Sequence, residues 1–451
     1  MNIPTINIEA AGDQRPLDAS AQLLHLYAEA ADTLPGNAAV RALRDAAIAG
    51  FAAKGLPNRR VEEWKYTDLR RLMSEAYAPA QSQPGVTASM LDAALGELAR
   101  IDAVKLVFVN GALQPGLSDI GGLAKGAELS SLADVLEAPP EWLLAVLGKV
   151  NPPDGDIVSQ LNTAFMTGGV VLRLGAGVKL ERPVHLILVS AGEQPVASSL
   201  RNLVVLEMGA ELTLVESYVS IGGSPVQTNV AAEVKVGPGG RLRHYKISGE
   251  TGRAQHLAST MVDLAETADY LAVNFADSGA VARHQTFLRF GGDGARAHFY
   301  GAQLLREHQH CDMTLVIDHA AVGCESREHV KAVLADQSQG VFQAKVIVRP
   351  DAQKTDGRQM AQALLLSDAA EFDAKPELEI YADDVKCNHG ATCGALDDDM
   401  MFYLMARGIP EDEAKSLLVQ AFIGEVLDQV EHEGLREALA ARAVRWLSKR
   451  S

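Results

Sequence analysis

A short stretch near the C-terminus gathers a thiol, an imidazole and two neighbouring carboxylates, supplied by Cys387, His389, Asp383 and Asp384. The apolar residues around them predict a strand over Ile380–Val385. If that strand continues, Cys387 and His389 project from one face, because alternate residues of a strand share a face. A thiolate and a neutral imidazole on one face suit iron, zinc or copper(I). A buried cysteine beside a structural histidine is the alternative that these residues leave open.

A second group of histidines and cysteines lies upstream and has the residue types of a metal site. Its members are His308, His310, Cys311, His319, Cys324 and His329. Their spacing is not that of a zinc finger, and in an extended segment the two leading histidines alternate faces with Gln309 and Cys311. We therefore expect stacked core residues or turn residues here, and a stable metal is the less favoured interpretation.

The charge of the chain argues against two classes of partner. The 451 residues carry a formal net charge of −17, with a sequence pI near 5.2. Nucleic acids and anionic membranes are both bound through clustered Lys and Arg. We therefore expect no nucleic-acid partner and no membrane partner.

The cysteines and the N-terminus indicate the compartment. Four cysteines, Cys311, Cys324, Cys387 and Cys393, form no CxxC pair and no disulfide ladder, which suits a reducing environment. Met1–Pro16 lacks a basic segment followed by an apolar core, so no signal or transit peptide is predicted. No apolar run approaches the roughly 20 residues that span a bilayer. The expected location is the cytoplasm.

The chain divides into three predicted regions. Residues 1–150 are mixed and mostly helical, with a break at Pro35-Gly36 between two amphipathic segments. Trp64 and Tyr66 lie in a charged, aromatic segment of this region. They could bind a ligand or partner, but the favoured interpretation is a helix start that packs both rings on the neighbouring domain.

Residues 151–395 consist of short β-branched runs that are separated by glycine turns. The turns include Gly175-Ala176-Gly177, Gly209-Ala210, Gly237-Pro238-Gly239-Gly240 and Gly291-Gly292-Asp293-Gly294. A spacing of roughly 30 residues is typical of internal repeats that stack into a solenoid. The sequence therefore predicts a mainly β chain with a β-solenoid core, and a Greek-key sandwich remains the structural alternative.

Residues 396–451 are predicted to be helical. Asp397-Asp398-Asp399 precedes a helix over Met400–Met405 that ends near Gly408, and Pro410 starts a second helix. One apolar face is predicted on the second helix, formed by Ala414, Leu417, Leu418, Ala421, Phe422, Val426 and Leu427. Such a face could dock on the solenoid or bind a partner subunit.

Several catalytic motifs are missing from the sequence. It contains no GxxxxGK[ST] phosphate loop, no strand-linked GxGxxG and no GxSxG elbow. We therefore expect that the chain does not hydrolyse ATP by itself.

Motifs along nearly the whole chain resemble the SufD type of the SufB/SufD family, which forms the scaffold of SUF iron–sulfur cluster assembly. The most specific is Lys386-Cys387-Asn388-His389-Gly390-Ala391-Thr392. Others are the Arg60–Thr67 segment, the region from Cys311 to Arg327 and the Lys354-Thr355-Asp356 turn.

This resemblance implies a scaffold subunit that is not itself an enzyme, and it implies a fold, partners and roles for residues. It implies a right-handed parallel β-helix between an N-terminal and a C-terminal helical domain. It also implies pairing with SufB, docking of the SufC ATPase, and a transient iron–sulfur cluster or iron shared with SufB near His389 and Cys387. A homodimer of the isolated chain is a further option. The implied SufC-docking residues are Arg407, Gly408, Ile409, Leu417, Leu418, Ala421 and Phe422.

Ligand chemistry leads to the expectation that the lone chain retains no cluster. Fe–S clusters are held mostly by thiolates, and one Cys with one His supplies at most two ligands. Cys393 follows the motif, so a Cys387–Cys393 pairing or accessory ligation stays open. Two rival functions also stay open. One is a structural adaptor without cluster chemistry, and the other is a β-helix carbohydrate-active enzyme that uses surface carboxylates such as Asp383, Asp384 and the Asp397–Asp399 run.

Overall fold

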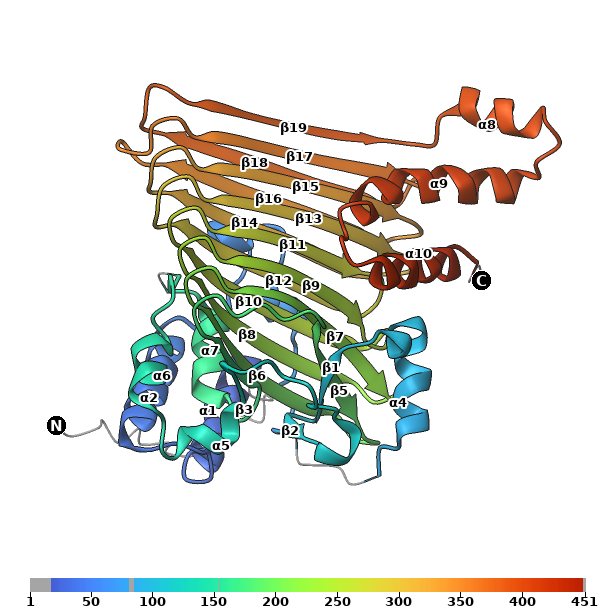
Figure 1. Ribbon diagram of the computed structural model, residues 1–451. Coiled ribbons are helices and arrows are strands. Elements are labelled where there is room, and N and C mark those ends of the chain that lie inside the picture. Colours follow the sequence, from blue (N-terminus) through green and yellow to red (C-terminus); the bar gives the residue numbers. More distant parts are fainter. Residues whose placement is uncertain (1–17, 81–84, 154, 449–451) are drawn as a thin grey trace.

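The structure is a computed structural model that describes residues 18–80, 85–153 and 155–448. Strands take 40% of it and helices 27%, which makes the chain mainly β as predicted. Figure 1 shows a β-solenoid of about 8 turns, with helices beside its N-terminal end and along its C-terminal half. The solenoid is confirmed, and the sandwich alternative is wrong. Met1–Pro16, on which the absence of a targeting signal was predicted, lies outside the described residues.

Two sheets form the walls of the solenoid within the described residues. In order, sheet B contains β19 (Lys386–Gly394), β17 (Asp356–Leu365), β15 (Glu325–Leu334), β13 (Arg296–Leu305), β11 (Asp269–Ala276), β9 (Arg241–Gly249), β7 (Glu211–Ile221), β5 (Val184–Ala191), β1 (Val104–Val109) and β2 (Ala112–Leu113). Sheet A contains β18 (Glu371–Ile380), β16 (Gln339–Val348), β14 (His310–His319), β12 (Val281–Phe290), β10 (Ala254–Leu264), β8 (Val226–Val236), β6 (Val196–Leu206), β4 (Val170–Leu174) and β3 (Ala127–Ser131).

Successive coils contribute one strand to each sheet, and the pairings from β4 to β19 are parallel. His310 pairs with Gln339, 29 residues later, which matches the repeat length predicted from the glycine turns. Gly209 and Gly239 adopt positive φ values of 66° and 63° in these turns. Their N–H groups donate to Pro238 and Glu266 of the following coil. Glycine is favoured there because a side chain disfavours this backbone conformation.

The N-terminal end of the solenoid uses strands from the first 150 residues. β1 pairs in parallel with β5, and β3 pairs antiparallel with β4. The division of the chain at residue 150 stays a prediction, since these strands extend both sheets from the N-terminal side. The right-handed sense of the coil also stays a prediction.

N-terminal helices cover the outer face of sheet A. They are α1 (Ala19–Ala30), α2 (Ala38–Lys54), η1 (Glu62–Trp64), α3 (Leu69–Leu72), α5 (Leu132–Leu136), α6 (Glu141–Val146) and α7 (Ile157–Phe165). α7 crosses β6, β8 and β10, and α2 packs on α7. The gap between α1 and α2 contains the predicted Pro35-Gly36 break. Asn37 caps α2 by accepting hydrogen bonds from Ala39 N and Val40 N.

A second group of helices covers the outer face of sheet B. It comprises α4 (Ala88–Leu95), η2 (Gly96–Arg100), η3 (Pro115–Leu117), α9 (Glu411–Leu427) and α10 (Glu433–Ser448). α4 packs on β7, while α9 lies across β13 and β15. α8 (Asp398–Met405) projects beside α9, away from the sheets (Figure 1). Within the described residues no helix is long and apolar enough to cross a membrane.

Candidate functional site

The predicted strand Ile380–Val385 is wrong. β18 ends at Ile380, and β19 begins at Lys386, so the intervening residues form the turn that joins the two sheets. The reason is a ladder of hydrogen bonds between turns of neighbouring coils. Lys354 N donates to Asp384 O at 2.7 Å, and the Lys354 ammonium pairs with the Asp384 carboxylate. The paired carboxylates that suggested chemistry therefore include one that holds a turn in place.

Cys387 and His389 both lie on β19, the last strand of sheet B. Cys387 pairs with Gly357 and His389 with Gln359 of β17, and both partners are buried. The sulfur of Cys387 packs half-buried against the apolar interior of the solenoid, whereas His389 is exposed. Residues two apart on a strand share a face. The thiol and the imidazole therefore face the interior of the solenoid at its end.

This end of the solenoid is open. Among the described residues no strand pairs with the outer edge of β18 or of β19, and β19 exposes most of its residues. The uppermost coil in Figure 1 thus presents two rows of unpaired backbone N–H and C=O groups. Unpaired edges are templates for strand pairing with another chain.

Burial controls the state of the Cys387 thiol. It raises the pKa of Cys387 above its ordinary value, and the Asp356 and Glu328 carboxylates add to this, while a hydrogen bond with the Gly357 backbone opposes it. In the free chain the thiol therefore stays protonated at neutral pH. A thiolate, the form that binds metal, needs a cation or a metal nearby to stabilise it.

A Cys387–Cys393 disulfide, which the sequence left open, is excluded by geometry. Both cysteines are free. They lie six residues apart on the extended strand β19, which separates their Cα atoms by about 20 Å. A disulfide needs Cα atoms within about 7 Å of each other.

The donor set at the open end is incomplete. Across the described ranges there is no cluster of three or more His, Cys, Asp or Glu side chains that could hold a metal ion. Cys387 and His389 are soft and borderline donors at the open end, and Cys393, exposed farther along the same face of β19, is a third, so its accessory ligation stays a prediction. An Fe–S cluster needs more ligands than Cys387 and His389 alone supply.

The upstream histidines and cysteines have separate structural partners. His310 Nε2 contacts the Thr67 hydroxyl at 2.9 Å, and its Nδ1 contacts Gln339 Oε1 at 3.0 Å. His319 stacks on Phe290 inside the solenoid, with ring centroids 4.4 Å apart. The remaining members lie apart from these. Cys311 and Cys324 are buried, His329 contacts Gln362 of the neighbouring strand, and His308 lies exposed in a turn.

The aromatic segment of the N-terminal region packs on the solenoid. The Trp64 ring is buried, and the guanidinium of Arg283 in β12 stacks over it at 3.8 Å. Arg283 also pairs with the buried Asp312 carboxylate of β14 and donates to Glu63 O at 2.8 Å. The Thr67 hydroxyl donates to the same carboxylate. These contacts support the packing interpretation of Trp64.

The predicted apolar face of α9 is partly wrong. The helix buries Ala414, Val419, Ile423, Val426 and Leu427. Of the other predicted residues, Leu418 and Phe422 are half-buried, while Leu417 and Ala421 are exposed. The helix contains apolar residues on more than one side, so the sequence pattern could not identify the side that meets sheet B.

Exposed apolar side chains gather on α8 and the facing part of α9. We call Met400, Phe402, Tyr403, Met405 and Leu417 the α8 patch; Phe402 is 75% exposed. None of the α8 residues is buried.

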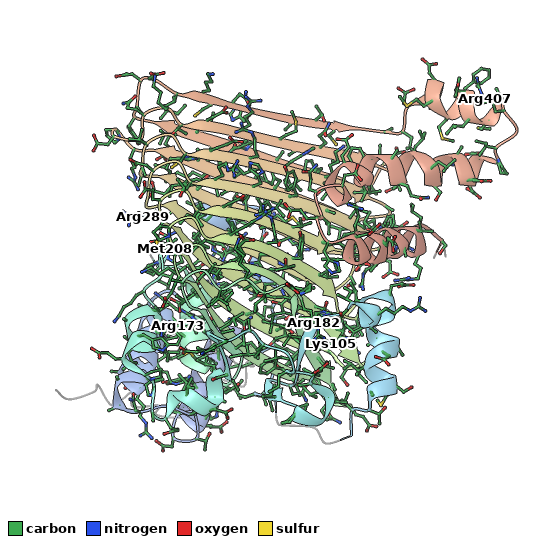
Figure 2. All side chains as sticks on the ribbon, in the orientation of Figure 1. Lys105, Arg173, Arg182, Met208, Arg289 and Arg407 are labelled. Atoms are coloured by element: carbon green, nitrogen blue, oxygen red, sulfur yellow. The ribbon has the colours of Figure 1, made fainter. Side chains whose placement is uncertain are left out.

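The residues after α8 turn the chain toward α9. The Arg407 guanidinium stacks on the Tyr403 ring at 3.4 Å, at the outer end of this unit (Figure 2). Gly408 has a φ of 84° where the chain leaves the helix, and Ile409 is half-buried. Sequence reasoning predicted the helix of the α8 patch but not its exposed aromatic residues.

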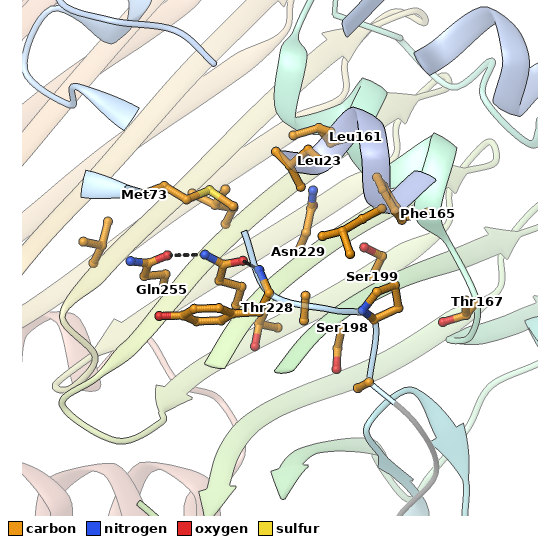
Figure 3. A pocket seen from close by; sticks show the side chains of 18 of the residues that line it. Leu23, Met73, Leu161, Phe165, Thr167, Ser198, Ser199, Thr228, Asn229 and Gln255 are labelled. Atoms are coloured by element: carbon orange, nitrogen blue, oxygen red, sulfur yellow. Dashed lines mark hydrogen bonds between the residues drawn. The ribbon is translucent and has the colours of Figure 1, made fainter. Parts of the chain in front are cut away.

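A cavity lies between α1, α7 and the outer face of sheet A (Figure 3). Leu23, Leu161 and Phe165 line its helical side, and Asn229 and Gln255 line its sheet side. Gln255 donates to the Leu72 carbonyl and accepts from Gln227, while Asn229 Oδ1 has no hydrogen-bond partner among the described residues. Its volume is about 60 Å³, room for about two water molecules. Apolar side chains of the helices thus face polar side chains of the sheet across this cavity.

Comparison with known proteins gives the family. The SufBD core domain of the SUF system for FeS cluster assembly matches residues 188–422, and the N-terminal region of SufBD proteins matches residues 17–186. The iron–sulfur cluster assembly protein SufD of Escherichia coli is 31% identical over 86% of this chain and 88% of its own length. A SufBD family protein of Synechocystis is 32% identical over 83% of the chain and 84% of its own length. The chloroplastic protein ABCI7 of Arabidopsis thaliana is 26% identical over 91% of the chain and 86% of its own length. With the β-solenoid and the Cys387–His389 strand in place, the chain belongs to the SufB/SufD family of the SUF iron–sulfur cluster assembly system, as a member of the SufD type.

Proposed function

We propose that this chain is a non-ATPase scaffold subunit that pairs with SufB through the open end of its solenoid. In this role His389 and Cys387 contribute to a site between the subunits where a nascent iron–sulfur cluster is built. The observation that carries the proposal is the juxtaposition of two metal-ligand side chains with two unpaired strand edges. A chain that docks on these edges brings its own donors to the same place.

The incomplete donor set supports an assembly role over a storage role. Two ligands from this chain hold a cluster only while a partner supplies the others, so the product can leave. The cluster is therefore cargo, and the lone chain retains none. A stoichiometric, air-stable Fe–S chromophore on the purified lone chain would contradict this.

The α8 patch supports a second partner, the SufC ATPase. The exposed rings and methionines of α8 form an apolar surface beside Arg407, Gly408 and Ile409. Leu417 and Ala421 expose the adjoining side of α9, while Leu418 and Phe422 are half-buried beside them. Exposed apolar groupings of this kind mark protein contacts. ATP hydrolysis then belongs to the partner, in keeping with the missing phosphate loop in this sequence.

The carbohydrate-active alternative is not favoured by the carboxylates. Asp384 pairs with Lys354, and Asp397 caps α8 by accepting from Met400 N at 3.0 Å. These groups stabilise a turn and a helix end. The structural-adaptor alternative differs from the proposal in one respect, which is whether His389 is needed once the complex has formed.

The test is cluster reconstitution on the assembled complex. The chain is co-expressed with SufB and SufC, purified through a tag on this chain and reconstituted anaerobically, in native form and as H389A. The proposal expects a complex of unchanged size in which H389A forms little or no cluster.

A matched control variant distinguishes the loss of His389 from the loss of any other histidine. His25 lies on α1 with its side chain 63% exposed, far from the open end. H25A should form cluster as the native complex does. Equal cluster formation by native and H389A complexes would show that the motif is structural and that the chain acts as an adaptor.

A further inference from the structure

A polar column lies inside the solenoid beneath His389. Glu328 of β15 is in register with Gln359 of β17, and Gln359 is in register with His389 of β19. The next residue in the row is Phe299 of β13, so the column is polar only in the coils nearest the open end. Side chains in register on neighbouring parallel strands stack about 4.8 Å apart.

Two members of this column are buried with polar atoms that lack hydrogen bonds. Gln359 is 1% exposed, and among the described residues neither its Oε1 nor its Nε2 has a hydrogen-bond partner. Glu328 is 2% exposed, and its Oε2 also has no partner. Buried polar atoms are rarely left unpaired, because each loses its bonds to water.

The surroundings of the column are apolar. Phe342, Ala344 and Val346 of β16 belong to the interior core on the facing wall. Burial raises the pKa of Glu328 to about 8, which Ser326 and Arg327 only partly oppose. The carboxyl is therefore mostly protonated at neutral pH, but its Oε2 can still accept a hydrogen bond, and Gln359 Nε2 is an unpaired donor in the adjacent coil.

We propose that Glu328, Gln359 and His389 form one hydrogen-bonded chain, in which Gln359 is a positioning residue for the imidazole. Gln359 Nε2 donates to Glu328 Oε2, and a ring N–H of His389 donates to Gln359 Oε1. Rotations of these side chains bridge the distance between coils. This one arrangement provides partners for all three unpaired atoms.

The chain of hydrogen bonds selects the tautomer of His389. The proton sits on the ring nitrogen that faces the interior, and the other nitrogen keeps its lone pair toward the open end. Metal-binding histidines in proteins usually donate their second N–H to such an acceptor, which fixes the ring and raises its basicity. This inference rests on the proposed function for the role of His389, and it adds Gln359 and Glu328 as the residues that orient the imidazole.

The first test measures the initial rate of cluster formation in the SufB- and SufC-containing complex. Q359M keeps the length of the side chain and removes both polar groups. It should lower the rate by about 10-fold or more. E328Q keeps an acceptor oxygen and should have a smaller effect. Q303M is the matched control, because Gln303 is another fully buried glutamine of sheet B in a different row.

The outcomes separate this inference from the proposed function. If H389A abolishes cluster formation while Q359M behaves like Q303M, the positioning chain is wrong and the function stands. If H389A has no effect, the proposed function fails whatever Gln359 does.

A second measurement uses the lone chain and does not depend on cluster assembly. Histidine is labelled with ¹⁵N, and the spectrum of H389A assigns the His389 signals. The native chain should show His389 in one tautomer, whereas Q359M should show a mixture of both. A mixture in the native chain, or one unchanged tautomer in Q359M, would overturn the inference.

Discussion

Single side chains attach the N-terminal region to the solenoid. Arg283 is buried and combines an ion pair with Asp312, stacking on Trp64 and a hydrogen bond to Glu63 O. Each of these groups needs the others, since a buried charge without a partner is strongly destabilising. The Arg60–Thr67 motif of the family is thus explained here by packing.

Replacing Arg283 with methionine should destabilise the fold. R283M leaves the Asp312 carboxylate buried without its cation and should lower the free energy of unfolding by about 3–5 kcal/mol. Denaturant unfolding measures this as a lower midpoint. Arg289, on the same strand but exposed, is the matched control (Figure 2). An R289M midpoint as low as that of R283M would contradict the argument.

Buried histidines should make the chain acid-sensitive. Burial lowers the pKa of His185 and of His319 to about 3, against about 6.5 in an unfolded chain. Between these values the unfolded chain binds more protons than the folded one, so stability rises with pH. It is therefore lost as the pH falls from about 6.5, by up to about 1.4 kcal/mol per pH unit for each histidine.

Thermal unfolding across this pH window checks the contribution of His319. H319Q should reduce the pH dependence of the unfolding temperature, because it removes one titrating group. H25Q alters an exposed histidine and should leave the pH dependence unchanged. An unaltered slope in H319Q would refute the assignment.

Among the elements, the helices α8 and α9 differ in what they contact. α9 buries one side on β13 and β15, which fixes the pair to the solenoid, and α8 keeps its apolar side chains exposed. Lys331 of β15 strengthens this attachment, since its buried ammonium pairs with Glu425 and lies 4.4 Å from the Phe422 ring. Because α9 is attached to the solenoid and α8 packs on α9, the apolar side chains of α8 are held in a fixed position at the surface.

Replacing Phe402 with serine should weaken capture of the SufC ATPase. The ring is 75% exposed, so its loss should change the unfolding temperature little while lowering affinity by more than about 1 kcal/mol if it is a binding anchor. Titration of purified SufC against the chain gives the affinity. Met208, 63% exposed in a solenoid turn, supplies the control M208S (Figure 2). Equal binding by F402S and M208S would exclude Phe402 from the interface.

At the level of the whole molecule, the two ends of the solenoid differ. Antiparallel strands and helices enclose the N-terminal end, whereas no strand of the described part of the chain pairs with the outer edges of β18 and β19 at the C-terminal end. Natural β-proteins normally protect such edges. The open end therefore suits an obligatory partner, and in the absence of that partner a second copy of the chain could occupy it.

A proline on the free edge should block both kinds of pairing. Lys386 N donates to Thr355 O of the turn before β17, so by alternation Ala391 N points to the open side. A391P removes one free donor and keeps the bonds to β17. It should reduce self-association of the lone chain and its complex with SufB, both measured by light scattering after size exclusion.

The control for A391P is A395P, which lies beyond the end of β19 in an exposed link. It should leave both associations intact. If A391P associates with itself and with SufB as strongly as A395P does, the edge of β19 is not the contact surface.

The sequence by itself determined the solenoid and the helical ends, and it indicated that Cys387 and His389 share one face if they lie on a strand. Regularly spaced glycine turns and β-branched runs are local patterns, so a single sequence is enough to recognise them. Period-two alternation placed the thiol and imidazole on one face for the same reason. The strand predicted over Ile380–Val385 was wrong, because the residues after Ile380 form a turn that the Lys354–Asp384 contact ties to the turn of the preceding coil.

Tertiary structure alone decided what lies beneath His389 and which side of α9 is buried. Glu328 and Gln359 are distant from His389 in sequence and meet it only through the register of three coils. That register depends on the length of every turn, which no local pattern records. The burial of α9 likewise depends on the shape of sheet B, against which Val419 and Ile423 pack although Leu417 has the same apolar character.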